Sequence, residues 1–302
     1  MPVVVRSPAK VNLLLSVGPV RADGYHDLLT VFHALSLEDT ITVSERPSGT
    51  GIELTMAGEG AEELPLDATN LAHRAAALLA QAAEVEPDVS IHIDKDIPIA
   101  GGMAGGSADA AGVLVACDAL WRLGYDRERL SQLAAQLGSD VPFALHGGNA
   151  IGRGRGEEIT PILGRGQFHW VLALAEGGLS TPQVYARCDE LRGDAPVPEA
   201  EISDELVQAL RSGDADQLAG ALHNDLQPAA LSLRPALRGL LESGLEFGAL
   251  AGLVSGSGPT CAFLVRDGEH ALDVAVALTA TGACRTVKRA SGPVPGAHVV
   301  AS

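Results

Sequence analysis

The chain has 302 residues, of which 46% are hydrophobic and 20% charged, so it is globular and long enough for two domains. Its net charge of −17 argues against nucleic-acid binding, because no cluster of Lys and Arg offsets it. No apolar run approaches the roughly 18 residues that a membrane span needs. The N-terminus lacks a signal or transit pattern, and four scattered cysteines indicate reduced thiols in a cytoplasmic protein.

Two strand patterns open the chain, at residues 3–6 and 10–17, and the segment Ser-Pro-Ala is predicted to separate them. Alternation along the second pattern places Lys10 and Asn12 on the same face. A pair of polar residues in this arrangement is open to two interpretations. It could be a solvated sheet edge, or it could belong to a functional site.

The turn that follows contains the strong turn dipeptide Asp-Gly and then Tyr25 and His26. These two side chains could stack on a flat ring or cover the end of a hairpin. A helix is predicted from residue 67 to about 85, with Asp67 or Thr69 as its cap. Between the turn and this helix, strands are predicted at residues 28–37, 40–44 and 52–56.

The segment Pro98–Asp109 reads P-I-A-G-G-M-A-G-G-S-A-D and follows an alternating strand pattern at residues 89–93. An apolar helix pattern continues from it to about Trp121. Its glycines free backbone N–H groups to converge on an anion, and the positive end of the helix dipole would face the same point. We expect Ser107 to cap this helix and Asp109 to lie in its first turn. A tight strand–helix connection would also use glycine, but this context favours phosphate binding.

The segment is not a Walker P-loop, which ends in Gly-Lys-Ser/Thr, and its GG-x-x-GG spacing does not match the dinucleotide motif G-x-G-x-x-G. Catalytic groups must therefore lie elsewhere. A helix predicted at residues 126–137 ends at Gly138 and leads to the corner S-D-V-P-F. There Asp140 could cap the next turn, or act as a general base or metal ligand. Arg153 and Arg155 follow in the sequence, and they could be either surface residues or phosphate contacts.

The second half of the chain predicts another mixture of helices and strands. An apolar strand at residues 170–175 precedes a helix from Thr181 to about Leu191. The segment S-G-S-G-P-T, residues 255–260, is predicted as a glycine turn between two buried strands. Further helices are predicted at residues 202–210, 214–222, 235–242 and 269–280, and a further strand at residues 285–288. We expect residues 290–296 to be frayed.

Three segments together resemble, in order, the three motifs of the GHMP kinases. They are P-A-K-V-N-L from Pro8, the glycine segment from Pro98, and G-S-G-P-T from Gly256. Within that superfamily, R-A-D-G-Y-H-D-L and G-S-D-V-P-F look like the 4-diphosphocytidyl-2-C-methyl-D-erythritol kinase family of the non-mevalonate isoprenoid pathway. The resemblance implies two α+β lobes with the active site between them. An N-terminal ATP-binding domain would span residues 1–162 and a ferredoxin-like C-terminal domain residues 163–302.

The resemblance also implies transfer of the ATP γ-phosphoryl group, with Mg²⁺, to the 2-hydroxyl of the methylerythritol unit to give the 2-phosphate. Asp140 would be the base, and Lys10 would lie beside it and neutralise charge on the transferring group. The cytidine diphosphate substrate would be bound by Asn12, Tyr25, His26 and Thr181. The ATP phosphates would be wrapped by Pro98, Ile99, Ala100, Gly101, Gly102, Met103, Ala104, Gly105, Gly106, Ser107 and Ala108.

The chain departs from the family pattern in the glycine segment. Many members carry glycine at the positions of Ala100 and Ala104, and a second serine at that of Ala108. If Ala104 must adopt a positive φ, alanine there costs about 1 kcal/mol. Because alanine replaces serine at position 108, Ser107 would be the one hydroxyl of the loop that could bind phosphate or magnesium. No dedicated protein ligands for the metal are predicted.

Two other functions stay open at this point. One is another GHMP kinase, of the homoserine or mevalonate type, although D-G-Y-H argues against it. The other is a nucleotide-binding regulator without catalysis, which the presence of both Lys10 and Asp140 disfavours. As partners we expect a small-molecule substrate, no nucleic acid and no membrane, in a monomer or weak homodimer.

Overall fold

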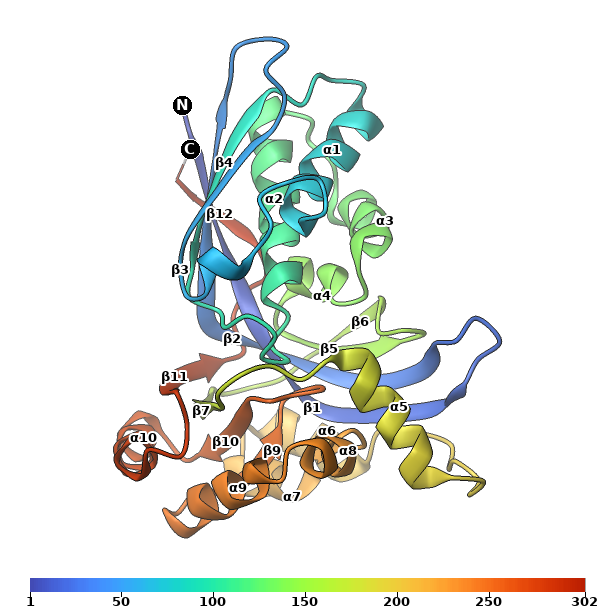
Figure 1. The fold of residues 1–302 in the computed structure, drawn as a ribbon, viewed down its shortest axis with the longest axis vertical. Coiled ribbons are helices and arrows are strands. Elements are labelled where there is room, and N and C mark those ends of the chain that lie inside the picture. The colour runs from blue at the N-terminus through green and yellow to red at the C-terminus, as the bar shows by residue number, and fades with distance from the viewer. Residues whose placement is uncertain (302) are drawn as a thin grey trace.

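The computed structural model describes residues 1–301, which form two α+β lobes, one above the other in Figure 1. The upper lobe has an eight-stranded sheet made of β1 (Val3–Val20), β2 (His26–Glu45), β3 (Glu53–Gly58), β4 (Val89–Lys95), β5 (Asn149–Arg153), β6 (Glu158–Ile162), β8 (His223–Asn224) and β12 (His298–Ala301). The lower lobe has a four-stranded antiparallel sheet made of β7 (Phe168–Leu174), β9 (Ala251–Val254), β10 (Cys261–Val265) and β11 (Thr286–Gly292). The predicted two-lobe α+β fold is confirmed.

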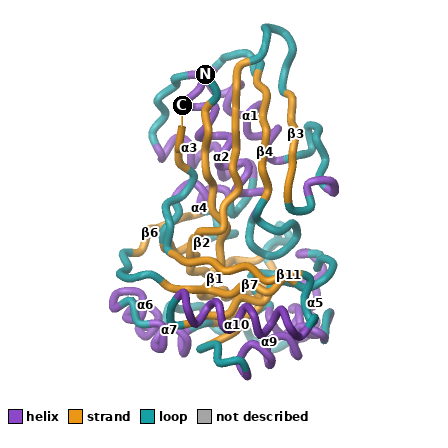
Figure 2. The backbone as a smooth tube through the Cα atoms, turned by 90° about the vertical axis from the view of Figure 1, so that its left-hand side faces the viewer, coloured by secondary structure: helices purple, strands orange, loops and turns teal. Residues whose placement is uncertain are grey.

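Helices of the upper lobe all lie on one face of its sheet (Figures 1 and 2). They are the 3₁₀ helix η1 (Ala61–Glu63), α1 (Leu71–Ala83), α2 (Gly105–Trp121), α3 (Arg127–Leu137) and α4 (Val141–His146). The lower lobe carries α5 (Thr181–Arg192), α6 (Asp204–Ser212), α7 (Ala215–Ala221), α8 (Gln227–Leu233), α9 (Ala236–Glu246) and α10 (Gly268–Thr281). None of the helices within residues 1–301 is both long and apolar enough to cross a bilayer.

The longest strands, β1 and β2, pair along their whole length and extend from the upper lobe into the lower one (Figure 1). The breaks predicted at Ser-Pro-Ala and at residues 38–39 are therefore wrong. Pro8 lacks a backbone N–H, but a shift of register between Pro8 and Ala9 accommodates it without ending the strand. One continuous hairpin thus carries side chains from the upper core to the junction of the lobes.

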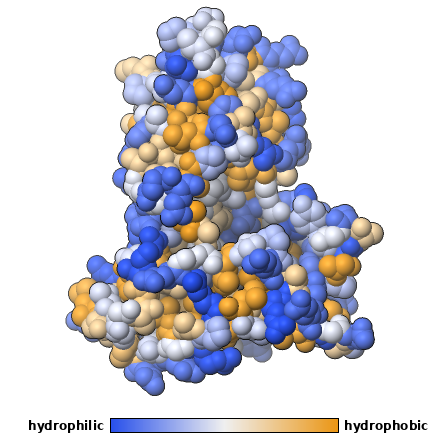
Figure 3. Space-filling model, in the orientation of Figure 1, coloured by the Kyte–Doolittle hydropathy of each residue, from blue (hydrophilic) through white to orange (hydrophobic). Residues whose placement is uncertain are grey.

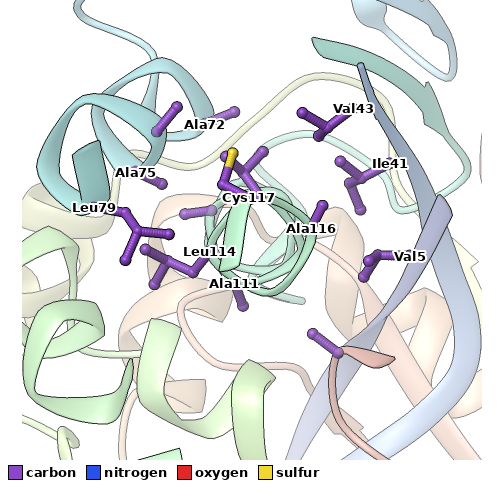
Figure 4. Close-up of a cluster of buried hydrophobic side chains, with 14 of the residues drawn as sticks. Val5, Ile41, Val43, Ala72, Ala75, Leu79, Ala111, Leu114, Ala116 and Cys117 are labelled. Carbon is purple, nitrogen blue, oxygen red and sulfur yellow. The ribbon is translucent and has the colours of Figure 1, made fainter. Parts of the chain in front are cut away.

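Helix α2 is the centre of the upper core, and Figure 4 looks down its axis. It is apolar all round, which is typical of a buried helix. On one side α1 contributes Ala72, Ala75 and Leu79, and on the other the sheet contributes Val5, Ile41 and Val43. Small residues allow close packing, because a Cβ on Gly112 would lie 2.5 Å from Ile41 Cδ1.

Two local predictions about helix and chain ends are wrong. The cap of α1 is Asn70, whose side chain accepts from the Ala72 N–H, whereas Asp67 accepts from Thr69 in the preceding turn. The segment after residue 290 is not frayed. It completes β11 and then returns to pair with β1 as β12, so the two chain ends lie together in Figures 1 and 2. The helix predicted at residues 126–137 is confirmed as α3, with Asp126 as its N-cap and Gly138 as its C-cap.

A buried charged triad joins three elements of the upper lobe. Lys95, at the end of β4, donates to Asp39 of β2 at 2.5 Å and to Asp109 of α2 at 2.7 Å, and all three side chains are buried. Burial raises the pKa of the Asp109 carboxyl to about 8; Lys95 opposes this rise and Asp39 adds to it. Burial therefore favours the protonated form of Asp109, and the charge of Lys95 opposes it.

The titration of Asp109 predicts a dependence of stability on pH. Because its folded-state pKa lies above the unfolded value, the native state is favoured at low pH and loses stability as pH rises from about 4 to about 8. Asp109→Asn keeps an acceptor for Lys95 but cannot titrate. Across this window, the wild type should lose up to about 1.4 kcal/mol per pH unit relative to the variant in chemical unfolding experiments. Parallel stability profiles of the two proteins would contradict the assignment.

Two glycines of α9 provide a matched test of packing in the lower lobe. A Cβ on Gly244 would lie 2.1 Å from Cε1 of the buried Phe263, whereas Gly239 is exposed with nothing within 4 Å. Gly244→Ala should therefore destabilise the protein by about 1–3 kcal/mol. Gly239→Ala should stabilise it by about 0.5–1 kcal/mol through helix propensity. Unfolding midpoints that move in the same direction for both variants would show that this packing is wrong.

Candidate active site

A cavity of about 450 Å³ lies where the two lobes meet, at the indentation visible in Figure 3. Its walls come from β1 and β2, the glycine segment, and the turn at residues 256–258 of the lower lobe. A second cavity, of about 520 Å³, adjoins it around Tyr25 and His26. Both cavities are lined by Asp140 and Thr181, so most of the predicted ATP segment and the predicted substrate residues face one continuous space. Met103 and Ala108 of that segment do not line it, because their side chains are buried in the core.

The glycine segment forms the loop between β4 and α2, and two of its alanines have left-handed backbone conformations. The φ angles are 51° at Ala100 and 61° at Ala104, so the expected strain at Ala104 is confirmed. Gly102 also has a positive φ, and a Cβ there would lie 2.0 Å from the Ser255 carbonyl oxygen. Glycine at this position therefore allows the lower lobe to approach the loop.

The start of α2 differs from its prediction. The helix begins at Gly105, and Ala104 occupies the cap position without a side-chain hydrogen bond. Ser107 is consequently not the cap but lies in the first turn and lines both cavities. Asp109 lies beyond the first turn and is buried in the triad with Lys95. The first-turn amides of α2 have no intrahelical acceptors, as is general for the helix N-termini at which anions bind.

Lys10 and Asn12 lie on one face of β1, as predicted, but both are buried, so the solvated-edge interpretation is wrong. Lys10 Nζ donates to Asn12 Oδ1 at 2.7 Å and to the Gly102 carbonyl oxygen at 2.9 Å. Asn12 Nδ2 in turn donates to Thr30 Oγ1 at 2.8 Å. Burial lowers the pKa of Lys10, and the charge of Asp140 opposes that shift.

Asp140 precedes α4 but its side chain does not cap that helix. One carboxylate oxygen instead lies 3.8 Å from Lys10 Nζ, and the side chain is 32% exposed. Burial raises the pKa of the nearby Tyr185 phenol, and the Asp140 charge contributes to the shift. The carboxylate therefore faces the cavity beside a buried cation, which is an arrangement suited to accepting a proton from a bound hydroxyl.

The second cavity brings α5 against the turn that carries Tyr25 and His26. His26 Nε2 lies 3.0 Å from Asp189 Oδ1, and its ring centroid lies 5.1 Å from that of Tyr185. Tyr25 is 56% exposed. Tyr185 and Asp189 were not predicted, although Thr181, Tyr185 and Asp189 recur at the four-residue spacing of one helix face. That spacing was the signal available in the sequence.

Two further contacts connect the site to its surroundings. Thr181 Oγ1 lies 2.9 Å from Ser257 Oγ, which joins α5 to the glycine turn of the lower lobe. Asp39, a member of the buried triad, accepts from the backbone N–H groups of Asp96 and Ile97, which immediately precede the glycine segment. The sequence did not predict any role for Lys95 or Asp39. Their contacts tie the phosphate loop to the core.

The chain is similar to known kinases along its whole length. Residues 70–148 match the GHMP kinases N terminal domain, and residues 206–284 match the GHMP kinases C terminal domain. A curated relative from Mycolicibacterium smegmatis, a 4-diphosphocytidyl-2-C-methyl-D-erythritol kinase, is 60% identical over 99% of this chain and 92% of its own.

Solved structures give the same result. The crystal structure of a 4-(cytidine 5'-diphospho)-2C-methyl-D-erythritol kinase has a TM-score of 0.77 at 33% identity and covers 96% of this chain and 98% of its own. A homoserine kinase from Cytophaga hutchinsonii has a TM-score of 0.76 at 17% identity, over 99% of this chain and 97% of its own, and shares the fold alone. The chain therefore belongs to the 4-diphosphocytidyl-2-C-methyl-D-erythritol kinase family of the GHMP kinases, and is a small-molecule kinase with ATP as its phosphoryl donor.

Proposed function

We propose that the protein transfers the γ-phosphoryl group of ATP to the 2-hydroxyl of 4-diphosphocytidyl-2-C-methyl-D-erythritol and forms the 2-phosphate. This is a step of non-mevalonate isoprenoid precursor biosynthesis. The observation that carries the proposal is the Lys10–Asp140 pair, 3.8 Å apart, which faces the glycine loop on one side and the His26 cavity on the other. The substrate named for the relatives supports the acceptor.

In this proposal Asp140 accepts the proton of the attacking hydroxyl as that oxygen bonds to the γ-phosphorus and the bond to the β-phosphate breaks. Phosphoryl transfer has a loose transition state, so positioning and charge compensation carry most of the catalysis. Lys10 is held by Asn12 and the Gly102 carbonyl, so its ammonium is already placed when the nucleotide binds. The ATP phosphates are proposed to lie on the glycine loop, Pro98 to Ala108.

The substrate is proposed to bind across the second cavity. Its cytosine lies near Tyr25, His26 and Tyr185, where aromatic rings and a histidine that is paired with Asp189 offer stacking and hydrogen bonds. Its methylerythritol hydroxyls lie near Asn12 and Thr181, which line the first cavity beside Asp140. This arrangement directs one end of the substrate toward the base and the other toward the aromatic rings.

Magnesium fits the residues present. Mg²⁺ prefers oxygen ligands and keeps several waters and phosphate oxygens, so it needs few protein donors. Within residues 1–301, no cluster of three His, Cys, Asp or Glu side chains could hold a metal, whereas Ser107, which carries a hydroxyl, lines both cavities. We propose that Ser107 would hold the ion together with the ATP phosphates. The ion would supply charge compensation for the transferring group.

We further propose a division into an N-terminal domain, residues 1–162, and a C-terminal domain, residues 163–302, of which β8 and β12 pair with β1 of the N-terminal domain. A monomer or weak homodimer that does not bind nucleic acid is proposed, consistent with the net charge of −17. Cytoplasmic location is proposed on the basis of four free thiols, Cys117, Cys188, Cys261 and Cys284.

Removal of the base should abolish turnover while the fold remains. Asp140→Asn keeps the shape of the side chain but cannot accept a proton, so kcat should fall by about 10²–10⁴-fold. Lys10→Ala should also lower kcat severely, and in addition reduce stability because it leaves Asn12 Oδ1 without its donor. A coupled assay of ADP release measures kcat, and thermal unfolding confirms folding. Near wild-type kcat in folded Asp140→Asn would refute the mechanism.

His26→Ala should raise the KM for the cytidyl substrate with little change in the KM for ATP, because His26 lines the second cavity and not the first. The same assay over a panel that includes homoserine and mevalonate identifies the acceptor. Turnover with homoserine or mevalonate but not the cytidyl substrate would establish the alternative kinase. No phosphoryl transfer from labelled ATP to any acceptor, in a single turnover, would establish the non-catalytic regulator.

A further inference from the structure

Arg155 lies at the border between the two cavities. It is in the hairpin between β5 and β6, and its side chain lines both the cavity of the glycine loop and that of His26. Six residues line both spaces, and they are Leu28, Ser107, Asp140, Arg155, Thr181 and Tyr185. Arg155 is the one cation among them. It therefore lies, with Asp140, at the border of the two cavities.

The Arg155 guanidinium has more hydrogen-bond donors than its one side-chain contact uses, unlike the lysine side chains that line these cavities. Lys95 is held by two carboxylates, and Lys10 is held by Asn12 and the Gly102 carbonyl beside Asp140. Arg155 uses Nε on Glu157 Oε1, at 3.3 Å. That contact uses Nε and not the two terminal nitrogens, and the side chain is 38% exposed. The side chain lines both cavities, so these two nitrogens are available to a bound ligand.

The position of Arg155 is built by its neighbours. Its backbone N–H donates to Glu157 Oε2 at 2.6 Å, so one carboxylate orients both the main chain and the side chain. The guanidinium carbon lies 5.2 Å from the centroid of the Tyr25 ring, within the range of a cation–π contact. A guanidinium held at Nε presents its terminal nitrogens as a fork that matches two phosphate oxygens.

We propose that Arg155 binds the diphosphate of the nucleotide-linked substrate and so positions the acceptor hydroxyl for Asp140. This inference rests on the proposed function. In such a substrate the diphosphate lies between the base and the hydroxylated group that is phosphorylated. Arg155 has the corresponding place in the protein, since it contacts Tyr25 at the base end and lines the cavity of Asp140 at the other. The ATP phosphates have a separate cradle in the glycine loop.

The hairpin supplies a matched control. Arg153, two residues earlier, is exposed and lines neither cavity, so Arg153→Gln removes the same charge without touching the site. Arg155→Gln should raise the KM for the cytidyl diphosphate substrate about 10-fold or more, with the KM for ATP changed less than about 2-fold. Arg155→Lys should recover part of the loss, because lysine restores the charge but not the fork. Arg153→Gln should match the wild type in both constants.

Calorimetry with CDP and with cytidine separates phosphate binding from base binding and does not need turnover. The wild type should bind CDP more tightly than cytidine, and Arg155→Gln should weaken CDP alone. The proposal would be overturned if Arg155→Gln and Arg153→Gln had equal effects. It would also be overturned if Arg155→Gln changed the KM for ATP instead, or weakened CDP and cytidine binding equally. If the wild type binds CDP through Arg155 but does not phosphorylate the cytidyl substrate, the proposed function fails while the diphosphate site remains.

Discussion

The buried ammonium group of Lys10 is the constraint on which the site depends. An unpaired charge in a protein interior costs several kcal/mol, so Lys10 must be surrounded by acceptors. Those acceptors come from three elements: Asn12 of β1, the Gly102 carbonyl of the glycine loop, and Asp140 at the start of α4. The requirement that the Lys10 ammonium group be surrounded by acceptors therefore holds the phosphate loop and the Asp140 carboxylate at fixed places relative to β1.

That constraint extends to the lower lobe through one carbonyl group. The Gly102 oxygen accepts from Lys10 Nζ at 2.9 Å and from Ser255 Oγ at 3.1 Å, so the loop is held from both lobes at a single atom. Any side chain at Gly102 would collide with the Ser255 backbone, so the loop or the lower-lobe turn would have to move. A change in how the lobes meet would consequently move the loop and weaken the environment of Lys10 at the same time.

The local sequence pattern was sufficient to predict those parts of the site whose residues are close together in the sequence. The two-residue spacing of Lys10 and Asn12 predicted a shared face, and strand–glycine–helix order predicted the loop. The Lys95 triad, by contrast, joins three elements that are far apart in the sequence, and a local hydrophobic period carries no information about such contacts. The pairing of β12 with β1 likewise joins opposite ends of the chain. Ser107 was misplaced because Ala104 starts α2 with a left-handed backbone, which alanine rarely adopts.

The strained alanines make physical sense in a strongly acidic protein that binds polyanions. Lys10 and Lys95 lie beside carboxylates, so they add little net positive charge to the first cavity. Backbone amides must then supply much of the attraction, and successive right- and left-handed residues turn such amides toward one concave point. The left-handed conformations of Ala100 and Ala104 cost about 1 kcal/mol each relative to glycine, yet they retain this loop shape. Strain at these two residues is thus the expected cost of attracting phosphate with the main chain.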